Sequence, residues 1–398
     1  MGTAADVVVV GAGLAGVAVA AALAARGRQV RVLERVAPGS QASAQNAGML
    51  RRMGEDPYER ALALRTHELL VSDPAFAEAS RRTGALLAFG RDPGHLHDAA
   101  AHLEAAGVPH RWRDGVPPEA GEVFAGAPLL GAWWLPEERV VDAWSVLTVL
   151  LGRLRDHGGG VDIAAVQGLE RTGGRWSIRT TEGPVVADHV VLAAGAWSGA
   201  LARTLGLERP LFPLRRTLLL TDPHPLHRAD APWCWVDDEG VYVRPEGGGF
   251  LVSGCDEAVD FPQDRESRGV VEMRPRALAL SKLERWFPAL GEVGLRGGWS
   301  GLRTFAPDRR PVLGADPEAE GLWWAAGLGG FGVSCGLAAG EAVAAWMCGV
   351  DVPTLRPRGV SPGRPMLGRW MVRPDGDLAG AVAMAGQLPA NLEGFDER

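Results

Sequence analysis

Residues 7–16 read Val-Val-Val-Val-Gly-Ala-Gly-Leu-Ala-Gly, and this short stretch decides the fold. The β-branched run Val7–Val10 is typical of a buried parallel strand. The alanine-rich segment Leu14–Arg26 predicts a helix, and Gln29–Glu34 predicts a second strand. A strand, a G-x-G-x-x-G turn, a helix and a strand in this order form the fingerprint of a dinucleotide-binding unit.

Each glycine of the turn has a separate physical task. Gly11 permits the tight turn, Gly13 lets a pyrophosphate approach the backbone, and Gly16 allows the helix to pack closely on the strand. The helix N-terminus at Leu14 and Ala15 presents N–H groups and a positive dipole end to the phosphates. The turn is therefore predicted to hold the diphosphate of the dinucleotide.

An acidic residue ends the second predicted strand. Glu34 lies 18 residues after Gly16, where a carboxylate accepts hydrogen bonds from both ribose hydroxyls. The same charge disfavours a 2′-phosphate. Arg35 follows and completes this part of the predicted nucleotide site, which by itself fits either NAD or FAD.

Three later segments favour FAD. The small, polar stretch Ser40–Leu50 suits backbone contact with a planar ring. The predicted strand 187–198 ends in Ala-Ala-Gly, as expected beside a diphosphate. Gly321–Ser334 is a second glycine-rich segment before a predicted helix. A helix N-terminus stabilises the negative charge that builds on a flavin when it is reduced.

A β-meander is predicted before the strand 187–198. Its strands are Val161–Val166 and Arg175–Thr180, and Gly173-Gly174 forms the turn between them. The residues predicted to bind FAD come from all of these segments. They are Gly11, Gly13, Leu14, Ala15, Gly16, Glu34, Arg35, Ala42, Ser43, Ala47, Gly48, Met49, Val166, Ala194, Gly195, Trp197, Leu328, Gly329, Gly330, Phe331, Gly332 and Val333.

Composition excludes several classes of protein. The 398 residues are 46% hydrophobic and 22% charged, which is a globular composition, and the net charge of −7 leaves no basic stripe for nucleic acid. The four cysteines form no C-x-x-C pair and no histidine stands at zinc spacing, so no metal site is predicted. The apolar run Val17–Ala25 is too short to span a bilayer, and no signal peptide is visible. We expect no membrane span and a cytoplasmic location.

With these pieces placed, the chain resembles the D-amino-acid oxidase superfamily of flavoproteins over residues 5 to 350. The nearest type is the branch of glycine oxidase, D-amino-acid dehydrogenase and sarcosine oxidase. The motifs that carry the resemblance are 8–16 (VVVGAGLAG), 46–50 (NAGML), 192–198 (LAAGAWS), 241–245 (VYVRP), 301–303 (GLR), 307–314 (PDRRPVLG) and the segment from Ala325 onward.

The resemblance implies an α/β fold of two domains. A Rossmann-type FAD-binding domain would be discontinuous, over residues 1–85, 140–213 and 300–350. A mainly antiparallel-sheet substrate domain would comprise 86–139 and 214–299. Residues 351–398 match nothing in the family and are predicted as a C-terminal extension.

The resemblance also implies the chemistry and its residues. An amino acid or amine substrate would place its α-carbon over flavin N5, and hydride transfer would give an imine that hydrolyses. Arg303, in the Gly-Leu-Arg segment, is predicted to clamp the substrate carboxylate with two hydrogen bonds. Tyr242 lies on a strand that carries a substrate-facing aromatic in the family. Asp256 and Glu257 would attract the substrate amine or accept its proton.

Three departures from the family narrow these expectations. Sarcosine-oxidase-like members have an oxygen-activating lysine where Val252 aligns, whereas the single lysine here is Lys282. The electron acceptor is therefore left as O2 or a quinone or electron carrier. Gly301 stands where those relatives bear the flavin-linking cysteine, so FAD is expected to be non-covalent. Glycine oxidase has a second carboxylate-binding arginine near Gly330, so glycine is not the expected substrate.

Other functions fit the same fold. The chain could be an FAD-dependent 2-hydroxy-acid or polyol-phosphate dehydrogenase that attacks a C–O bond, or a flavin subunit of a larger dehydrogenase. A flavin hydroxylase would usually carry a Gly-Asp-Ala segment near its third FAD contact, and the sequence has none. Trp233, Trp235 and Trp299 are expected to pack, or else to line an aromatic substrate pocket.

Overall fold

The opening strand lies inside a mixed sheet whose central part is parallel. The computed structural model describes residues 5–54, 56–262, 271–353 and 355. Within them, β1 pairs in parallel with β2 on one side and with β12 on the other, β9 extends the sheet beyond β2, and β20 pairs with β12. The strands of this eight-stranded sheet are β1 Ala5–Val10, β2 Val30–Glu34, β9 Gly160–Ile163, β10 Val166–Thr172, β11 Arg175–Thr180, β12 Gly183–Leu192, β19 Val312–Ala315 and β20 Leu322–Ala326.

Helices cover the parallel strands. α1 packs against α4 and α7, and α2 packs against α7. α1 is predominantly apolar around its circumference, because it lies between the sheet and these neighbours. The helices of this part are α1 Leu14–Ala24, α2 Pro57–Ser72, α4 Ala143–Asp156, α5 Ser198–Arg203 and α7 Gly332–Met347.

A second, mostly antiparallel sheet forms the rest of the described chain. Its longest pairing joins β13 and β18, from Phe212 opposite Phe305 to Thr221 opposite Leu295. The nine strands are β5 Ala85–Phe89, β6 Arg111–Asp114, β7 Gly131–Leu135, β13 Phe212–Thr221, β14 Trp233–Val236, β15 Val241–Glu246, β16 Gly249–Ser253, β17 Ala258–Val259 and β18 Leu295–Phe305, with α3 Pro93–Ala105 and α6 Met273–Trp286 beside them.

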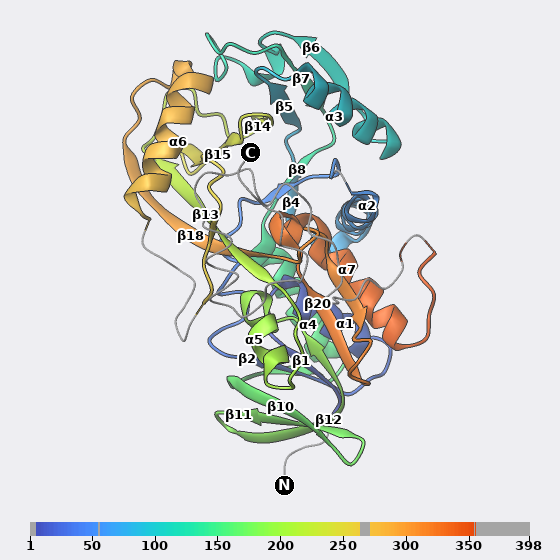
Figure 1. The fold of residues 1–398 in the computed structure, drawn as a ribbon. Coiled ribbons are helices and arrows are strands. Elements are labelled where there is room, and N and C mark those ends of the chain that lie inside the picture. Colours follow the sequence, from blue (N-terminus) through green and yellow to red (C-terminus); the bar gives the residue numbers. More distant parts are fainter. Residues whose placement is uncertain (1–4, 55, 263–270, 354, 356–398) are drawn as a thin grey trace.

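Smaller elements join the two sheets. A three-stranded sheet has β8 between β3 and β4, and short 3-10 turns mark several connections. In Figure 1 β10–β12 lie at the bottom, β5–β7 and α3 lie at the top, and β13 and β18 run between them. The bounds are β3 Met49–Leu50, β4 Ser80–Arg82, β8 Arg139–Val141, η1 Pro74–Phe76, η2 Pro118–Ala120, η3 Gly195–Trp197, η4 Pro288–Leu290 and η5 Gly329–Phe331.

The mixed α/β class is confirmed, while the predicted meander is partly wrong. Val161–Val166 is not one strand: β9 pairs with β2, and β10 begins only at Val166 and pairs with β11. The apolar run continues across the change of pairing partner, so its pattern could not show the break. The Gly173-Gly174 turn is present, with φ of 61° and 82°. The predicted domain boundaries stay a prediction, and the C-terminal extension lies outside the described residues except for 351–353 and 355.

Candidate active site

A large cavity lies between the two sheets. Its volume is about 1830 Å³, and it runs from the turn between β1 and α1 to the inner face of the nine-stranded sheet. Residues at its first end include the predicted fingerprint, and residues at its second end include several arginines and aromatics. We call these the nucleotide end and the substrate end.

The backbone of the fingerprint turn requires its glycines. Gly11 has φ of +105°, and a Cβ there would lie 2.6 Å from the Ala193 carbonyl oxygen. A Cβ on Gly16 would lie 2.1 Å from the carbonyl oxygen of Gly11, so only glycine lets α1 approach the turn. Glu34 accepts a hydrogen bond from the Ala12 N–H at 2.8 Å, which ties the second strand to the turn.

The structure places nearly all of the residues predicted to bind FAD around the cavity. Gly16 does not line it, because it packs beneath Gly11, and Gly48 is also absent from the lining. Gly48 instead forms a turn with φ of +69° in which its N–H donates to Asn46 Oδ1. The predicted residues that line the cavity are Gly11, Gly13, Leu14, Ala15, Glu34, Arg35, Ala42, Ser43, Ala47, Met49, Val166, Ala194, Gly195, Trp197, Leu328, Gly329, Gly330, Phe331, Gly332 and Val333.

These residues fit a dinucleotide. A Cβ on Gly13 would meet only the Ser43 hydroxyl, at 3.2 Å, so its Cα side is open. Gly13 is also the N-cap of α1 and supplies no side chain to its first turn, which leaves the helix dipole available to phosphates. The guanidinium of Arg35 lies 4.5 Å from the Trp197 ring centre, and both border the cavity. η5 and the start of α7 supply a second helix N-terminus at the cavity wall.

At the substrate end, strand alternation decides which side chains face the cavity. Arg216 on β13 pairs with Gly301 on β18, and Leu214 pairs with Arg303. Because facing residues of paired strands share one side of a sheet, Arg216 and Arg303 point the same way, and both line the cavity. Thr217, one residue further along β13, points to the opposite face.

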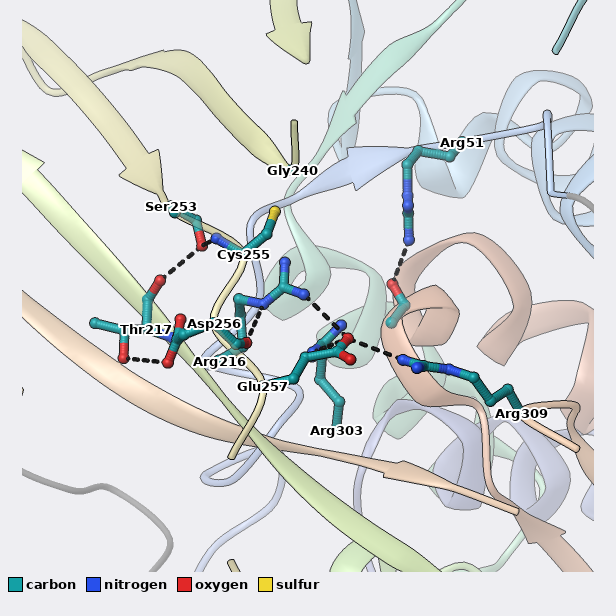
Figure 2. A network of polar contacts seen from close by, with 12 residues as sticks. Arg51, Arg216, Thr217, Gly240, Ser253, Cys255, Asp256, Glu257, Arg303 and Arg309 are labelled. Atoms are coloured by element: carbon teal, nitrogen blue, oxygen red, sulfur yellow. Dashed lines mark hydrogen bonds and ion pairs between the residues drawn. The ribbon is translucent and has the colours of Figure 1, made fainter. Parts of the chain in front are cut away.

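Three guanidinium groups converge on one carboxylate. The Oε1 atom of Glu257 accepts from Nη2 of Arg303 at 2.8 Å, of Arg309 at 2.8 Å and of Arg216 at 3.4 Å. The Glu257 side chain is only 7% exposed. Figure 2 shows the three arginines reaching this carboxylate from different segments of the chain. Glu257 is therefore committed to arginines, which does not favour its predicted role of attracting the substrate amine.

Asp256 faces away from the cavity. Its carboxylate accepts hydrogen bonds from the Thr217 N–H at 2.8 Å and from the Thr217 hydroxyl at 2.9 Å. Asp256 does not line the cavity, unlike its neighbour Glu257. Successive residues of an extended segment point to opposite sides, and the structure accordingly gives Asp256 the task of holding the segment on β13. This contact also fixes the position of Glu257.

Arg51 joins the cluster from an unexpected segment. Its guanidinium lies 4.7 Å from the Trp235 ring centre and 4.0 Å from that of Phe331, and it donates to the Gly330 carbonyl at 2.8 Å. A Cβ on Gly330 would lie 3.2 Å from Arg303 Nη1 and 3.4 Å from Arg51 Nη2, so both guanidinium groups meet at this glycine. The sequence does not single out Arg51, although this residue directly follows the segment predicted to touch the flavin.

Burial changes the acidity of the arginines. Burial, followed by the like charge of Arg216, lowers the pKa of Arg303 to about 10, although Glu257 opposes this shift. Burial also lowers the pKa of Arg51. Arg51 forms no ion pair with a described carboxylate, and Arg303 Nε is buried without a hydrogen-bond partner in the described structure. Arg303 shares the single carboxylate of Glu257 with two other arginines, so the cluster keeps an excess of positive charge. Buried positive charge without enough opposite charge is costly, so this end of the cavity favours an anionic ligand.

Aromatic residues complete the substrate end. Tyr242 lines the cavity and is 4% exposed, and burial raises the pKa of its hydroxyl. Its ring lies 5.1 Å from that of Trp235, which also lines the cavity. Trp233 is fully buried, and Trp299 donates its indole N–H to the Gln45 carbonyl. Of the three tryptophans considered from the sequence, only Trp235 borders the cavity.

Three further features bear on earlier expectations. Lys282 does not line the cavity, and its Nζ donates to the carbonyls of Glu239, Gly240 and Gly254. No group of described histidine, cysteine, aspartate and glutamate side chains is placed to hold a metal ion. The described stretch Gly329–Met347, rather than Val17–Ala25, is apolar and long enough to cross a bilayer, and 67% of it is buried within the protein.

Comparison with known proteins agrees with this geometry. The model of the family DAO, FAD dependent oxidoreductase, matches residues 6–346. The chain is 28% identical over 341 residues to glycine oxidase of Geobacillus kaustophilus, covering 81% of this chain and 87% of that protein. It is 32% identical over 314 residues to a D-amino acid dehydrogenase of Cereibacter sphaeroides, covering 76% and 67%.

A solved structure supports the same fold. The L-proline dehydrogenase from P. horikoshii superposes with a TM-score of 0.78 at 22% identity, covering 88% of this chain and 95% of that one. The match to the family model extends from the fingerprint strand through most of α7, so it includes both ends of the cavity. This chain therefore belongs to the DAO family of FAD-dependent oxidoreductases, as an enzyme of the amino acid oxidase and dehydrogenase type whose cofactor is FAD.

Proposed function

We propose that the enzyme oxidises the C–N bond of an amino acid or an N-substituted amino acid. The observation that carries this proposal is the meeting of Arg51 and Arg303 at Gly330, in a cavity that continues to the nucleotide fingerprint. Two guanidinium groups at one point are suited to a carboxylate, and a carboxylate is common to all amino acids. The substrate class follows from this anion site.

The two arginines would fix the orientation of the substrate. Arg303 is held by Glu257, and Arg51 is held between the rings of Trp235 and Phe331. Neither guanidinium has to be ordered when the substrate arrives, so less conformational entropy is lost on binding. With the carboxylate fixed, the adjacent α-carbon takes a single position in the cavity, which is the main requirement for transfer of its hydrogen.

The positive charge of the cluster would also prepare the substrate amine. A nearby cation disfavours the ammonium form and lowers the pKa of the substrate nitrogen. The neutral amine has the free electron pair that must form the C=N bond as hydride leaves the α-carbon. Tyr242, which lines the cavity, would accept or donate one hydrogen bond to the bound substrate.

The bound FAD supplies the acceptor of the hydride at N5. The residues at the nucleotide end hold it without a covalent link, and the substrate end excludes water through Tyr242, Trp235 and Phe331. The substrate loses one hydride and one proton and becomes an imine. Water then hydrolyses the imine to an oxo acid and ammonia or an amine. O2, or a quinone or electron carrier, would finally accept the two electrons that the substrate gives up.

Flavin absorbance under anaerobic conditions tests the proposal. The holoenzyme is mixed with D- and L-amino acids, N-methyl amino acids and 2-hydroxy acids, and bleaching of the flavin is followed. We expect at least one amino acid series to bleach it and the hydroxy acids to leave it oxidised. Bleaching by hydroxy acids alone would assign the enzyme to C–O oxidation. A flavin that no compound reduces would indicate a subunit of a larger dehydrogenase.

A further inference from the structure

The substrate end holds more guanidinium groups than one substrate carboxylate requires. Arg216, Arg303 and Arg309 share Oε1 of Glu257, and Arg51 forms no ion pair with a described carboxylate. An α-carboxylate at Gly330 would engage Arg51 and Arg303. Arg216 and Arg309 would still share a single oxygen atom of Glu257.

Hydrogen-bonding capacity leads to the same conclusion. Each guanidinium has five N–H donors in a planar fork, and a carboxylate satisfies two of them side by side. Arg303 and Arg216 each reach Glu257 through Nη2 alone, while Arg216 Nε donates to the Asp256 carbonyl at 3.0 Å and Arg303 Nε is buried without a described partner. Donors of this kind, next to a cavity, are complementary to a further oxygen anion.

Backbone strain marks the same place. In the described chain, two residues other than glycine have positive φ: Cys255, at 55°, and Arg309, at 59°. Cys255 directly precedes the Asp256–Glu257 segment, and Arg309 carries one of the converging guanidinium groups, 4.5 Å from the Phe305 ring centre. Such conformations are unfavourable and cluster at functional sites. A bulky arginine occupies a position where glycine would be relaxed, and its side chain borders the cavity.

We propose that the substrate carries a second carboxylate, bound by Arg309 and Arg216 beside Glu257. The substrate class is then an amino acid with two acid groups: an α-amino dicarboxylic acid or an imino diacid. This inference rests on the proposed function and names its substrate class. The reaction is unchanged, because the second acid group takes part only in binding. Figure 2 shows the side chains involved, with Arg309 approaching from the side opposite Arg216.

Matched substrate pairs test the second carboxylate. The holoenzyme is reduced anaerobically with glutamate against glutamine, aspartate against asparagine, and iminodiacetate against N-methylglycine, using both enantiomers where they exist. We expect the diacid of at least one pair to reduce the flavin with a second-order rate constant at least about tenfold higher than its neutral partner. Equal or faster reduction by the neutral partner in every pair would overturn the inference.

A variant at the strained position tests the residue assignment. Arg309→Gly removes the guanidinium and relaxes the backbone, so the protein is expected to fold. Arg309→Asn, which also tolerates this conformation, is the second variant. Both should reduce the preference for the diacid about tenfold or more. Arg175→Gln on β11 removes an arginine that pairs with Asp188 at 2.7 Å, and neither residue lines the cavity, so this variant should keep the preference. An unchanged preference in both Arg309 variants would exclude Arg309 from the site.

Binding of acids that the enzyme cannot oxidise separates this inference from the proposed function. Succinate and butyrate have carbon chains of equal length, but succinate has a second carboxylate. Neither compound has an amine to oxidise. We expect succinate to perturb the flavin spectrum at a concentration at least about tenfold lower than butyrate. If succinate binds more tightly but no amine reduces the flavin, the proposed function fails and the second acid site stands. If amines reduce the flavin without any advantage of a diacid, the inference fails and the function stands.

Discussion

The two ends of the cavity are built in opposite ways. The nucleotide end is centred on one short turn, from Val10 to Ala15 with Gly16 packed beneath it, and the geometry of this turn depends on backbone atoms and on the lack of side chains. The substrate end brings together Arg51, Arg216, Glu257, Arg303 and Arg309, which come from widely separated segments. The first end is sensitive to added volume, whereas the second is sensitive to lost charge.

The difference follows from the physical cause of each arrangement. A left-handed or closely approached glycine is fixed by local backbone geometry, which a short motif encodes. A cluster of guanidinium groups is fixed by strand register and by the pairing of β13 with β18, which no short motif encodes. Substitutions at the two ends should therefore impair the enzyme in different ways.

The largest effect is expected for Gly16→Ala at the nucleotide end. The new Cβ would lie 2.1 Å from the carbonyl oxygen of Gly11, and a backbone atom cannot move aside as a flexible side chain can. We expect a loss of roughly 3 kcal/mol or more in the free energy of unfolding and a purified protein without flavin. Thermal unfolding of the apoprotein and flavin absorbance of the purified protein measure the two results.

Gly152→Ala in α4 is the matched control. A Cβ there meets nothing within 4 Å, and alanine favours a helix over glycine by about 1 kcal/mol. This variant should keep its flavin and melt at the same temperature as the parent or higher. If both alanine variants behave alike, the close approach at Gly16 does not govern flavin binding.

How far the sequence predicted the molecule depends on the same distinction. The fingerprint turn, the segment Ser40–Leu50 and the glycine-rich start of α7 are local patterns in the sequence, and the structure places most of their predicted residues along the cavity. Their role in binding FAD stays a prediction. Arg303 was found only through its family motif. Arg51 and Arg216 were missed, since nothing local separates them from the other arginines of an arginine-rich chain.

Adjacent acidic residues illustrate the limit most clearly. Asp256 and Glu257 were assigned one role together, yet Asp256 binds Thr217 behind the sheet and Glu257 binds the arginines in front. The alternation of an extended segment separates them, and the sequence does not state which of the two faces the cavity. The division of Val161–Val166 between β9 and β10 was missed for a related reason, because the pairing partner is not visible in the pattern.

At the substrate end, Arg303→Gln should leave the flavin in place and impair the reaction. The glutamine retains hydrogen-bonding atoms but loses the positive charge and the bidentate fork. We expect kcat/KM for the best amino acid to fall roughly 100-fold, because charge-assisted hydrogen bonds are worth about 1.5–3 kcal/mol each. Anaerobic flavin reduction by the same amino acid measures the change in the chemical step.

The control for Arg303 comes from the other face of the sheet. Arg215 on β13 pairs with Asp260 and does not line the cavity, so Arg215→Gln removes a similar charge without touching the substrate end. This variant should reduce kcat/KM by no more than about twofold, within the effect of a small change in stability. A loss of flavin in Arg303→Gln, or equal kinetic losses in the two variants, would contradict the separation of the two ends.

The smallest expected effect is a loss of carboxylate affinity at alkaline pH. Burial and the charge of Arg216 lower the pKa of Arg303 to about 10, so this guanidinium loses its proton as the pH rises through that value. The dissociation constant of butyrate, which has no amine of its own to titrate, should then increase about tenfold per pH unit above this point. Arg309 is also among the cations that lower this pKa. Arg309→Gly should therefore shift the loss of affinity to higher pH. If the loss of affinity stays at the same pH, a group other than Arg303 titrates there. Flavin absorbance is followed over the same pH range, because retention of flavin separates loss of the carboxylate clamp from loss of the cofactor.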